Sequence, residues 1–164
     1  MGQIDVEQLG FALGARVTGI DLTQPLNDLA KKAILDAWHR HLVLVFPGQD
    51  LTAEQQIAFS RNFGELERND FQPHYRDRDH PEILLVTNRH RNGRPSETRN
   101  TGRNWHSDLS YTTRPAKASL LLCKEKPPIG GDTMFANLYL AYETLSQPMR
   151  AFVETLEADR KSVV

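Results

Sequence analysis

The 164-residue sequence lacks several features that would assign it to large classes of protein. It has one cysteine, Cys123, which excludes a disulfide framework and a zinc site built from several thiolates. Its formal net charge is -1, so no net field attracts nucleic acid or an anionic membrane surface. No uninterrupted apolar run approaches the ~20 residues that a membrane-spanning helix needs. We therefore expect neither nucleic acid nor a membrane among its partners.

The first ten residues carry acidic side chains and lack the basic stretch followed by an apolar run that marks a secretory signal. Hydrophobic residues make up 39% of the chain and charged residues 25%, which is ordinary for a globular protein in water. Length and composition alone therefore predict a single domain with a cytoplasmic location.

The hydrophobic pattern predicts helices near both ends of the chain and strands between them. Apolar spacing with Asn27 as N-cap predicts a helix that ends near His41, and Thr52 followed by Gln55 has the form of a capping box. Later helices are expected over 138–145 and 149–156. Strands are expected over 15–22, 42–46, 83–87, 105–111, 118–123 and 133–136. This order favours an α+β fold built on an antiparallel sheet.

Among the remaining side chains, apolar character predicts core positions, and loop composition predicts solvated ones. Core positions are expected for Trp38, Phe59, Phe63 and Cys123. Solvated loop positions are expected for His80 and His90.

The segment 104–108, with the sequence NWHSD, contains the strongest candidate for chemistry. On a strand, residues two apart share a face, so His106 and Asp108 would project side by side, about 7 Å apart at Cα. An imidazole and a carboxylate at that spacing can hold one divalent metal. With one further histidine they form the facial triad of non-haem Fe(II) oxygenases. The pair alone also fits a half-exposed polar pair at the end of a strand.

Two other segments admit a functional interpretation. Thr133 follows the turn at Gly130 and Gly131, where its hydroxyl could donate to a carboxylate of a bound small acid. The alternative is a hairpin turn with threonine favoured by β propensity. The arginine-rich stretch 88–104 is either a solvated loop or a mobile lid whose Arg103 meets an anionic substrate.

Seven short segments follow one another along the chain in an informative order. They are LGA to GIDL at 13–22, VLVF at 43–46, QDLT at 49–52, FSRNFGEL at 59–66, WHSD at 105–108, GGDTMF at 130–135 and AYETLS at 141–146. In this order they resemble the taurine/2-oxoglutarate dioxygenase family, which includes aryloxyalkanoate and alkylsulfate dioxygenases. The resemblance extends over nearly the whole chain.

The resemblance implies a double-stranded β-helix (jelly roll) with flanking helices, and the use of Fe(II), 2-oxoglutarate and O2. By position, it makes His106 and Asp108 two iron ligands and Thr133 a contact of a 2-oxoglutarate carboxylate. Candidate substrate contacts are His74, Arg103 and Asn104. The implied activity is hydroxylation of a small anionic substrate, of the sulfonate, alkylsulfate or aryloxyalkanoate type, with release of succinate and CO2.

The sequence departs from the family pattern in its last third. The family needs a further histidine downstream of the His-x-Asp pair and then an arginine for 2-oxoglutarate, but none of the six histidines follows Asp108. We therefore expect residues 1–164 to be the N-terminal part of a single dioxygenase domain, with an incomplete jelly roll that is inactive alone. Its open strand edges favour association, so a homo-oligomer is expected.

Several alternatives to this expectation remain. The chain could be a degenerate relative, a non-catalytic jelly-roll scaffold, or one part of a site that a partner chain completes. A zinc hydrolase built on His106 and Asp108 is disfavoured because no second histidine or cysteine falls at a short zinc spacing from the pair.

Overall fold

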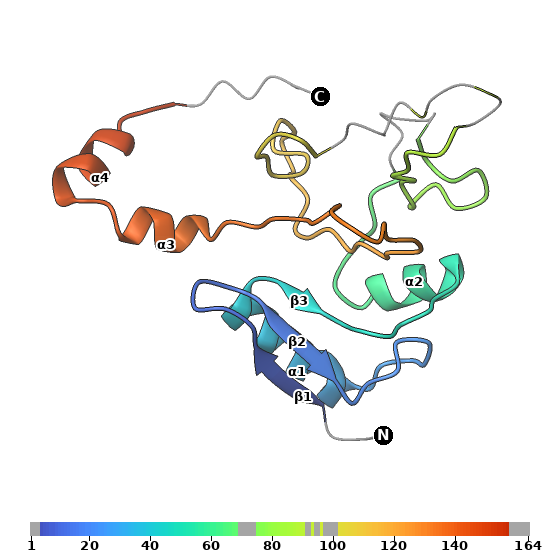
Figure 1. Cartoon of the computed structure of the whole chain (residues 1–164). Coiled ribbons are helices and arrows are strands. Elements are labelled where there is room, and N and C mark those ends of the chain that lie inside the picture. Colours follow the sequence, from blue (N-terminus) through green and yellow to red (C-terminus); the bar gives the residue numbers. More distant parts are fainter. Residues whose placement is uncertain (1–3, 69–74, 91–92, 94–95, 97–101, 158–164) are drawn as a thin grey trace. The chain divides into compact units, whose positions relative to one another are not determined.

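The computed structural model of the chain describes residues 4–68, 75–90, 93, 96 and 102–157. Its elements in chain order are β1 Asp5–Gln8, β2 Ala15–Thr18, α1 Asp28–His41, β3 Leu44–Val45, α2 Ala53–Ser60, α3 Leu138–Glu143 and α4 Gln147–Val153 (Figure 1). The described residues fall into two compact units. The first takes its residues from 1–51 and 122–158, and the second from 52–121.

The first unit contains a mixed three-stranded sheet in the order β1-β2-β3. β1 and β2 are antiparallel, with Asp5 opposite Thr18, whereas β2 and β3 are parallel, with Ala15 opposite Leu44. On β2, Ala15 and Val17 are buried while the residues between and after them are exposed, as expected for side chains that alternate between the two faces of a strand. The sheet is therefore mixed, whereas the sequence had suggested an antiparallel sheet.

Helix α1 begins and ends as the sequence predicts. The side chain of Asn27 accepts a hydrogen bond from the backbone N–H of Ala30 at 2.8 Å, which confirms it as the N-cap. At the other end, Leu42 has a φ of 64° and its N–H donates to the carbonyl of Trp38 at 2.7 Å. The indole N–H of Trp38 in turn donates to the carbonyl of Leu42 at 3.1 Å. These bonds satisfy backbone groups that a helix end would otherwise leave unpaired.

One face of α1 supplies part of the core of the first unit. Ala30, Ile34 and Ala37 are buried, at the spacing that places them on one side of a helix. The helix contacts β3 and crosses behind the strands in Figure 1. Val17, on the central strand, is 1% exposed. The expected core position of Trp38 is met only in part, because this side chain is half-buried.

Helix α2, in the second unit, has the predicted capping box. The hydroxyl of Thr52 accepts from the N–H of Gln55 at 3.2 Å, and the side-chain oxygen of Gln55 accepts from the N–H of Thr52 at 2.9 Å. Phe59 is buried, which confirms its predicted core position. Phe63 lies beyond the helix end and is half-buried, with its ring 5.2 Å from that of Phe59.

The predicted strands after α2 do not form among the described residues. The segments 83–87, 105–111, 118–123 and 133–136 contain no strand, and only an isolated bridge between Arg76 and Leu84 occurs there. A strand needs a hydrogen-bonded neighbour, and a single pair is marginal in water. The described part of the chain is thus a small mixed sheet with helices. It belongs to the α+β class and does not contain the two sheets of a jelly roll.

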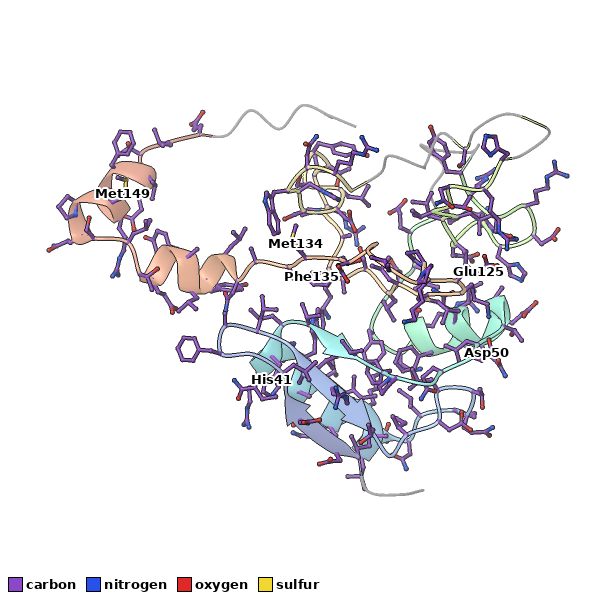
Figure 2. All side chains as sticks on the ribbon, viewed as in Figure 1. His41, Asp50, Glu125, Met134, Phe135 and Met149 are labelled. Atoms are coloured by element: carbon purple, nitrogen blue, oxygen red, sulfur yellow. The ribbon has the colours of Figure 1, made fainter. Side chains whose placement is uncertain are left out.

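Residues 122–157 contain two short helices and no buried residue. α3 begins at the predicted residue and ends two residues early, whereas α4 begins two residues and ends three residues earlier than predicted. Cys123 is exposed, so its predicted core position is wrong. Met134, Phe135 and Met149 are exposed as well (Figure 2). Every buried residue in the described part of the chain lies between positions 14 and 60.

The side chains of Lys124 and Asn137 connect residues 122–157 to the rest of the first unit. The ammonium of Lys124 lies 2.7 Å from the carboxylate of Asp50 and 3.1 Å from the carbonyl of Leu51, and Lys124 lowers the pKa of Asp50. The side-chain amide of Asn137 donates to the carbonyl of Ala12 at 2.6 Å.

No helix in the described part of the chain has the length and apolar character needed to cross a membrane.

Candidate functional site

The imidazole of His106 is held in one tautomer by its own backbone segment. Its Nδ1 lies 2.7 Å from the carbonyl oxygen of Asn104. A carbonyl can only accept a hydrogen bond, so Nδ1 is the donor and Nε2 is the ring nitrogen left for another partner. Metal-binding histidines in proteins are oriented by this kind of second hydrogen bond. The ring is therefore prepared to bind a cation through Nε2.

The carboxylate of Asp108 faces that nitrogen. Its Oδ1 lies 3.3 Å from Nε2 of His106, while its Oδ2 accepts a hydrogen bond from the hydroxyl of Ser119. The side chains of His106 and Asp108 are 53% and 51% exposed, so an ion from solvent can reach both. One oxygen and one nitrogen thus face each other, and the other polar atom of each side chain is already engaged.

This arrangement fits two ligands of one divalent metal ion. Two ligands at about 2.1 Å from an ion lie roughly 3 Å apart when they subtend a right angle. The observed 3.3 Å between Nε2 and Oδ1 is close to that separation. In the residues that the structure describes, no group of three His, Cys, Asp or Glu side chains lies close enough to hold a metal ion. Among the described residues, the candidate centre therefore consists of His106 and Asp108 alone.

The reason that His106 and Asp108 meet differs from the one predicted. The segment 105–111 is not a strand, so the alternation of side chains along a strand does not bring them together. The chain instead turns directly after Asp108: Leu109 has a φ of 52°, and its carbonyl accepts from the N–H of Thr112 at 3.0 Å. A leucine at positive φ is uncommon. The juxtaposition was predicted correctly, but its backbone cause was wrong.

The other predicted site residues are less closely tied to this pair. Asn104 takes part through its backbone carbonyl, and Arg103 is exposed on the same segment. Thr133 belongs to the other compact unit and is exposed after two glycines with φ of 74° and 76°. His74 lies outside the described residues.

Sequence reasoning missed a second polar cluster, which surrounds His80. Its Nδ1 lies 3.2 Å from Oδ1 of Asp77, and its Nε2 lies 3.1 Å from Oε1 of Glu54 on α2. The side chain is only 23% exposed, so the predicted solvated position of His80 is wrong. Its only signal in the sequence is an acidic residue three positions earlier, because Glu54 is distant along the chain.

These contacts shift the pKa values of all three groups. The hydrogen bond to Asp77 raises the pKa of His80, desolvation opposes it, and the bond to Glu54 adds to the rise. Desolvation raises the pKa of Asp77, but the backbone N–H of Asp79 and the contacts with His80 lower it by more. The pKa of Glu54 is lowered, chiefly by its own backbone N–H and by the hydroxyl of Thr52.

We expect the His80 bridge to stabilise the second unit most in mildly acidic solution. A raised pKa in the folded state means that the contribution of His80 is complete below the unfolded value of 6.5 and is lost as pH rises through the folded value. The carboxylates lose their contribution only at lower pH, as they are protonated. His80→Gln should therefore lower the free energy of unfolding more at pH 5.5 than at pH 9.

Urea unfolding of the two proteins at both pH values measures this difference. His90→Gln is the control, since His90 is exposed in a loop of the same unit. An equal loss of stability at the two pH values would show that the proton on His80 contributes nothing.

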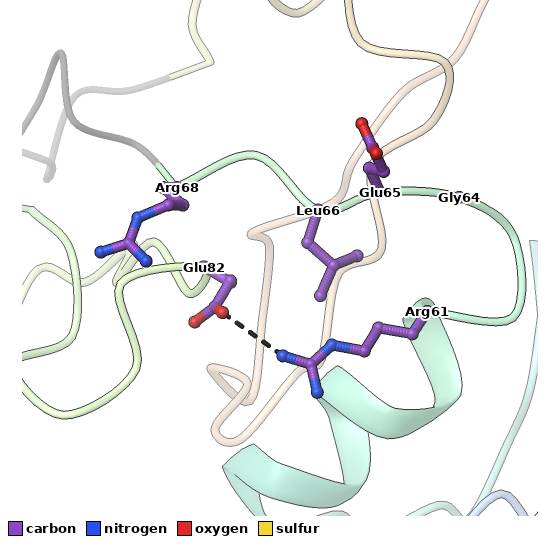
Figure 3. A pocket seen from close by; sticks show the side chains of 6 residues that line it. All are labelled: Arg61, Gly64, Glu65, Leu66, Arg68 and Glu82. Atoms are coloured by element: carbon purple, nitrogen blue, oxygen red, sulfur yellow. Dashed lines mark ion pairs between the residues drawn. The ribbon is translucent and has the colours of Figure 1, made fainter.

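An open cavity of about 550 Å³ also lies in the second unit. It is lined by Arg61, Gly64, Glu65, Leu66, Arg68 and Glu82 (Figure 3). A guanidinium nitrogen of Arg61 lies 3.5 Å from a carboxylate oxygen of Glu82. None of the predicted site residues lines this cavity. Because the pair Arg61–Glu82 spans its wall, the cavity carries mixed charge and favours neither anion nor cation.

His106, Asp108 and their hydrogen bonds define a candidate mononuclear metal centre with a nitrogen and an oxygen ligand. Comparison with known proteins agrees with this class. Residues 5–162 match the family described as taurine catabolism dioxygenase TauD, TfdA family. The chain belongs to this family.

Individual relatives support the same assignment. The chain is 37% identical over 155 residues to (S)-phenoxypropionate/alpha-ketoglutarate-dioxygenase of Sphingobium herbicidovorans, covering 94% of this chain and 52% of that protein. It resembles the crystal structure of a taurine dioxygenase from Burkholderia xenovorans with a TM-score of 0.72 and 36% identity, covering 93% of this chain and 51% of that one. The chain thus spans about half the length of the curated relatives it matches.

A third similar protein was solved with a metal. The crystal structure of AAD-2 in complex with Mn(II) and N-oxalylglycine is matched with a TM-score of 0.64 and 30% identity, over 93% of this chain and 50% of that one. The described fold of this chain is therefore that of part of a TauD-like dioxygenase.

Proposed function

We propose that the chain is the N-terminal part of an Fe(II)- and 2-oxoglutarate-dependent dioxygenase domain of the jelly-roll type. The observation that carries this proposal is the pairing of Nε2 of His106 with Oδ1 of Asp108, at 3.3 Å, with the other atom of each side chain engaged. An imidazole nitrogen with a carboxylate oxygen is the mixed ligand set of non-haem Fe(II) oxygenases.

The residues of this chain have distinct roles in that function. His106 and Asp108 hold the ion through Nε2 and Oδ1, and the carbonyl of Asn104 keeps the imidazole in the tautomer that binds. The hydroxyl of Thr133 donates to a carboxylate of 2-oxoglutarate. When bound, Fe(II) and 2-oxoglutarate supply the activation of O2 that hydroxylates a C–H bond and releases succinate and CO2.

We propose a small anionic organic molecule as the substrate. The similar proteins carry names that include phenoxypropionate, a carboxylate, and taurine, a sulfonate. Arg103 is exposed three residues before His106 and offers a guanidinium to either anion. His74 and Asn104 are further substrate contacts in this proposal. We also propose that the chain assembles as a homo-oligomer, since many apolar side chains are exposed. The proposed location is the cytoplasm.

A stability measurement tests the proposed function. Because a ligand that binds only the folded state must stabilise it, Fe(II) with 2-oxoglutarate should raise the unfolding temperature of the chain under anaerobic conditions. At a concentration 100 times the Kd, the gain is about 2.7 kcal/mol. Glutarate is the matched control, because it lacks the keto oxygen.

The outcomes separate the proposed dioxygenase from the scaffold alternative. A rise with Fe(II) and 2-oxoglutarate that glutarate does not reproduce supports the dioxygenase. No rise with either ligand contradicts it and favours a non-catalytic scaffold or a degenerate relative.

A further inference from the structure

An exposed carboxylate such as that of Asp108 can rotate, whereas binding a metal ion through one oxygen requires a single orientation. Its side chain is 51% exposed, and the two oxygens of a carboxylate exchange places when the group rotates by half a turn. An unrestrained carboxylate can also offer both oxygens to an ion at once. Holding one oxygen elsewhere removes these alternatives, and the remaining oxygen is then presented in a single direction.

Ser119 provides that restraint. Its hydroxyl donates a hydrogen bond to Oδ2 of Asp108, and Oδ1 is left facing Nε2 of His106 at 3.3 Å. The imidazole of His106 is arranged in the same way, because Nδ1 is bonded to the carbonyl of Asn104 while Nε2 faces the shared position. Both ligands are therefore oriented through the atom that does not face the shared position.

The backbone beside Ser119 is itself fixed within the second unit. The side-chain amide of Gln56 on α2 donates to the carbonyl of Leu120 at 3.3 Å. α2 is held by its capping box and by the buried side chains of Ile57 and Phe59. Ser119 lies eleven positions after Asp108 along the chain, so the hydroxyl reaches the carboxylate through the fold and not through local sequence.

We propose that Ser119 is a positioning residue of the metal centre, whose hydroxyl holds Oδ2 of Asp108 and directs Oδ1 toward the ion bound by His106. This inference rests on the proposed function, since it requires that His106 and Asp108 bind a metal. Partners that orient metal ligands typically contribute 10–100-fold to metal affinity. Ser119 does not itself touch the ion.

The experiment compares Ser119→Val with Ser119→Thr in the full 164-residue chain. Valine and threonine have nearly the same shape, but only threonine carries a hydroxyl. Titration with Mn(II), followed by the electron paramagnetic resonance of the free ion, gives the Kd. We expect Ser119→Val to weaken Mn(II) binding about 10–100-fold and Ser119→Thr to restore it to within about threefold of the unaltered chain.

Spectra and folding controls separate positioning from a structural role. The visible absorption of Co(II) bound to the chain reports on its ligands and should change with valine but not with threonine. Ser107→Ala is a control, because it removes a hydroxyl between His106 and Asp108 that makes no hydrogen bond to the carboxylate of Asp108 in the structure. Far-ultraviolet circular dichroism of the metal-free variants should be unchanged, and Ser119→Ala replaces the valine variant if valine disturbs the fold.

The outcomes distinguish the two hypotheses. If Asp108→Ala loses Mn(II) binding while Ser119→Val and Ser119→Ala keep the full affinity and the same Co(II) spectrum, the role of Ser119 is wrong and the metal centre stands. If the unaltered chain binds Mn(II) no better than Asp108→Ala does, the metal centre is contradicted and the role of Ser119 with it.

Discussion

Replacing Asp108 with alanine is expected to lower the affinity of the chain for Mn(II) or Fe(II) by more than about a hundredfold. Losing a residue that merely orients a ligand costs 10–100-fold, so losing the ligand itself must cost more. The effect is severe here because no third His, Cys, Asp or Glu of the described residues joins His106 and Asp108, and the variant leaves a single imidazole. His106→Ala should have an effect of the same order.

Direct titration with Mn(II) in solution, and with Fe(II) under anaerobic conditions, measures this loss. Two exposed residues of the same unit provide matched controls: Glu67→Ala removes a carboxylate and His90→Ala an imidazole, and both should bind like the unaltered chain. Asp108→Ala binding as tightly as the controls would show that His106 and Asp108 form only an ion pair. A loss confined to His106→Ala would point to binding through the imidazole alone.

The helices could be predicted from the sequence because their determinants are local. Asn27 caps α1 through a residue three positions away, and Thr52 and Gln55 close the capping box across the same distance. Such bonds depend on residue type and spacing, which a sequence displays directly. The strands were harder, because β2 is defined by its pairing with both β1 and β3, and an apolar run does not reveal its partner.

The segments 105–111 and 118–123 show what an apolar pattern cannot decide. Both have the composition of strands, yet neither has a strand partner among the described residues. Leu121 is 72% exposed, although the run that contains it looks like a buried strand. Strand formation depends on residues far away in the chain, whereas capping depends on near neighbours. This difference explains why the helices were located and these strands were not.

The same difference between near and distant neighbours along the chain applies to the candidate site. His106 and Asp108 were found because they are two residues apart and chemically suited to a metal. Ser119 and the bridge from His80 to Glu54 were missed, because each joins residues far apart in sequence, by 11 and 26 positions. The sequence therefore predicted that His106 and Asp108 lie side by side, while the structure adds the hydroxyl that bonds to Asp108.

Replacing Ile34 with alanine is expected to lower the free energy of unfolding by about 2–5 kcal/mol. Ile34 is 4% exposed on the face of α1 that supplies the core of the first unit, between the buried Ala30 and Ala37. Removing its outer carbon atoms loses apolar burial and leaves a cavity that small neighbours cannot fill. Alanine is the better helix former, but that gain is a few tenths of a kcal/mol and does not offset the loss.

Urea unfolding followed by circular dichroism measures the loss, and α1 offers a control within its own length. Leu29 lies on the same helix but is 81% exposed, so Leu29→Ala should change stability by less than about 0.5 kcal/mol. Ile34→Val should fall between the two, at about 0.5–1.5 kcal/mol, because it removes one methylene group. This graded order follows from burial alone. Equal effects of Ile34→Ala and Leu29→Ala would mean that the buried face of α1 does not hold the first unit together.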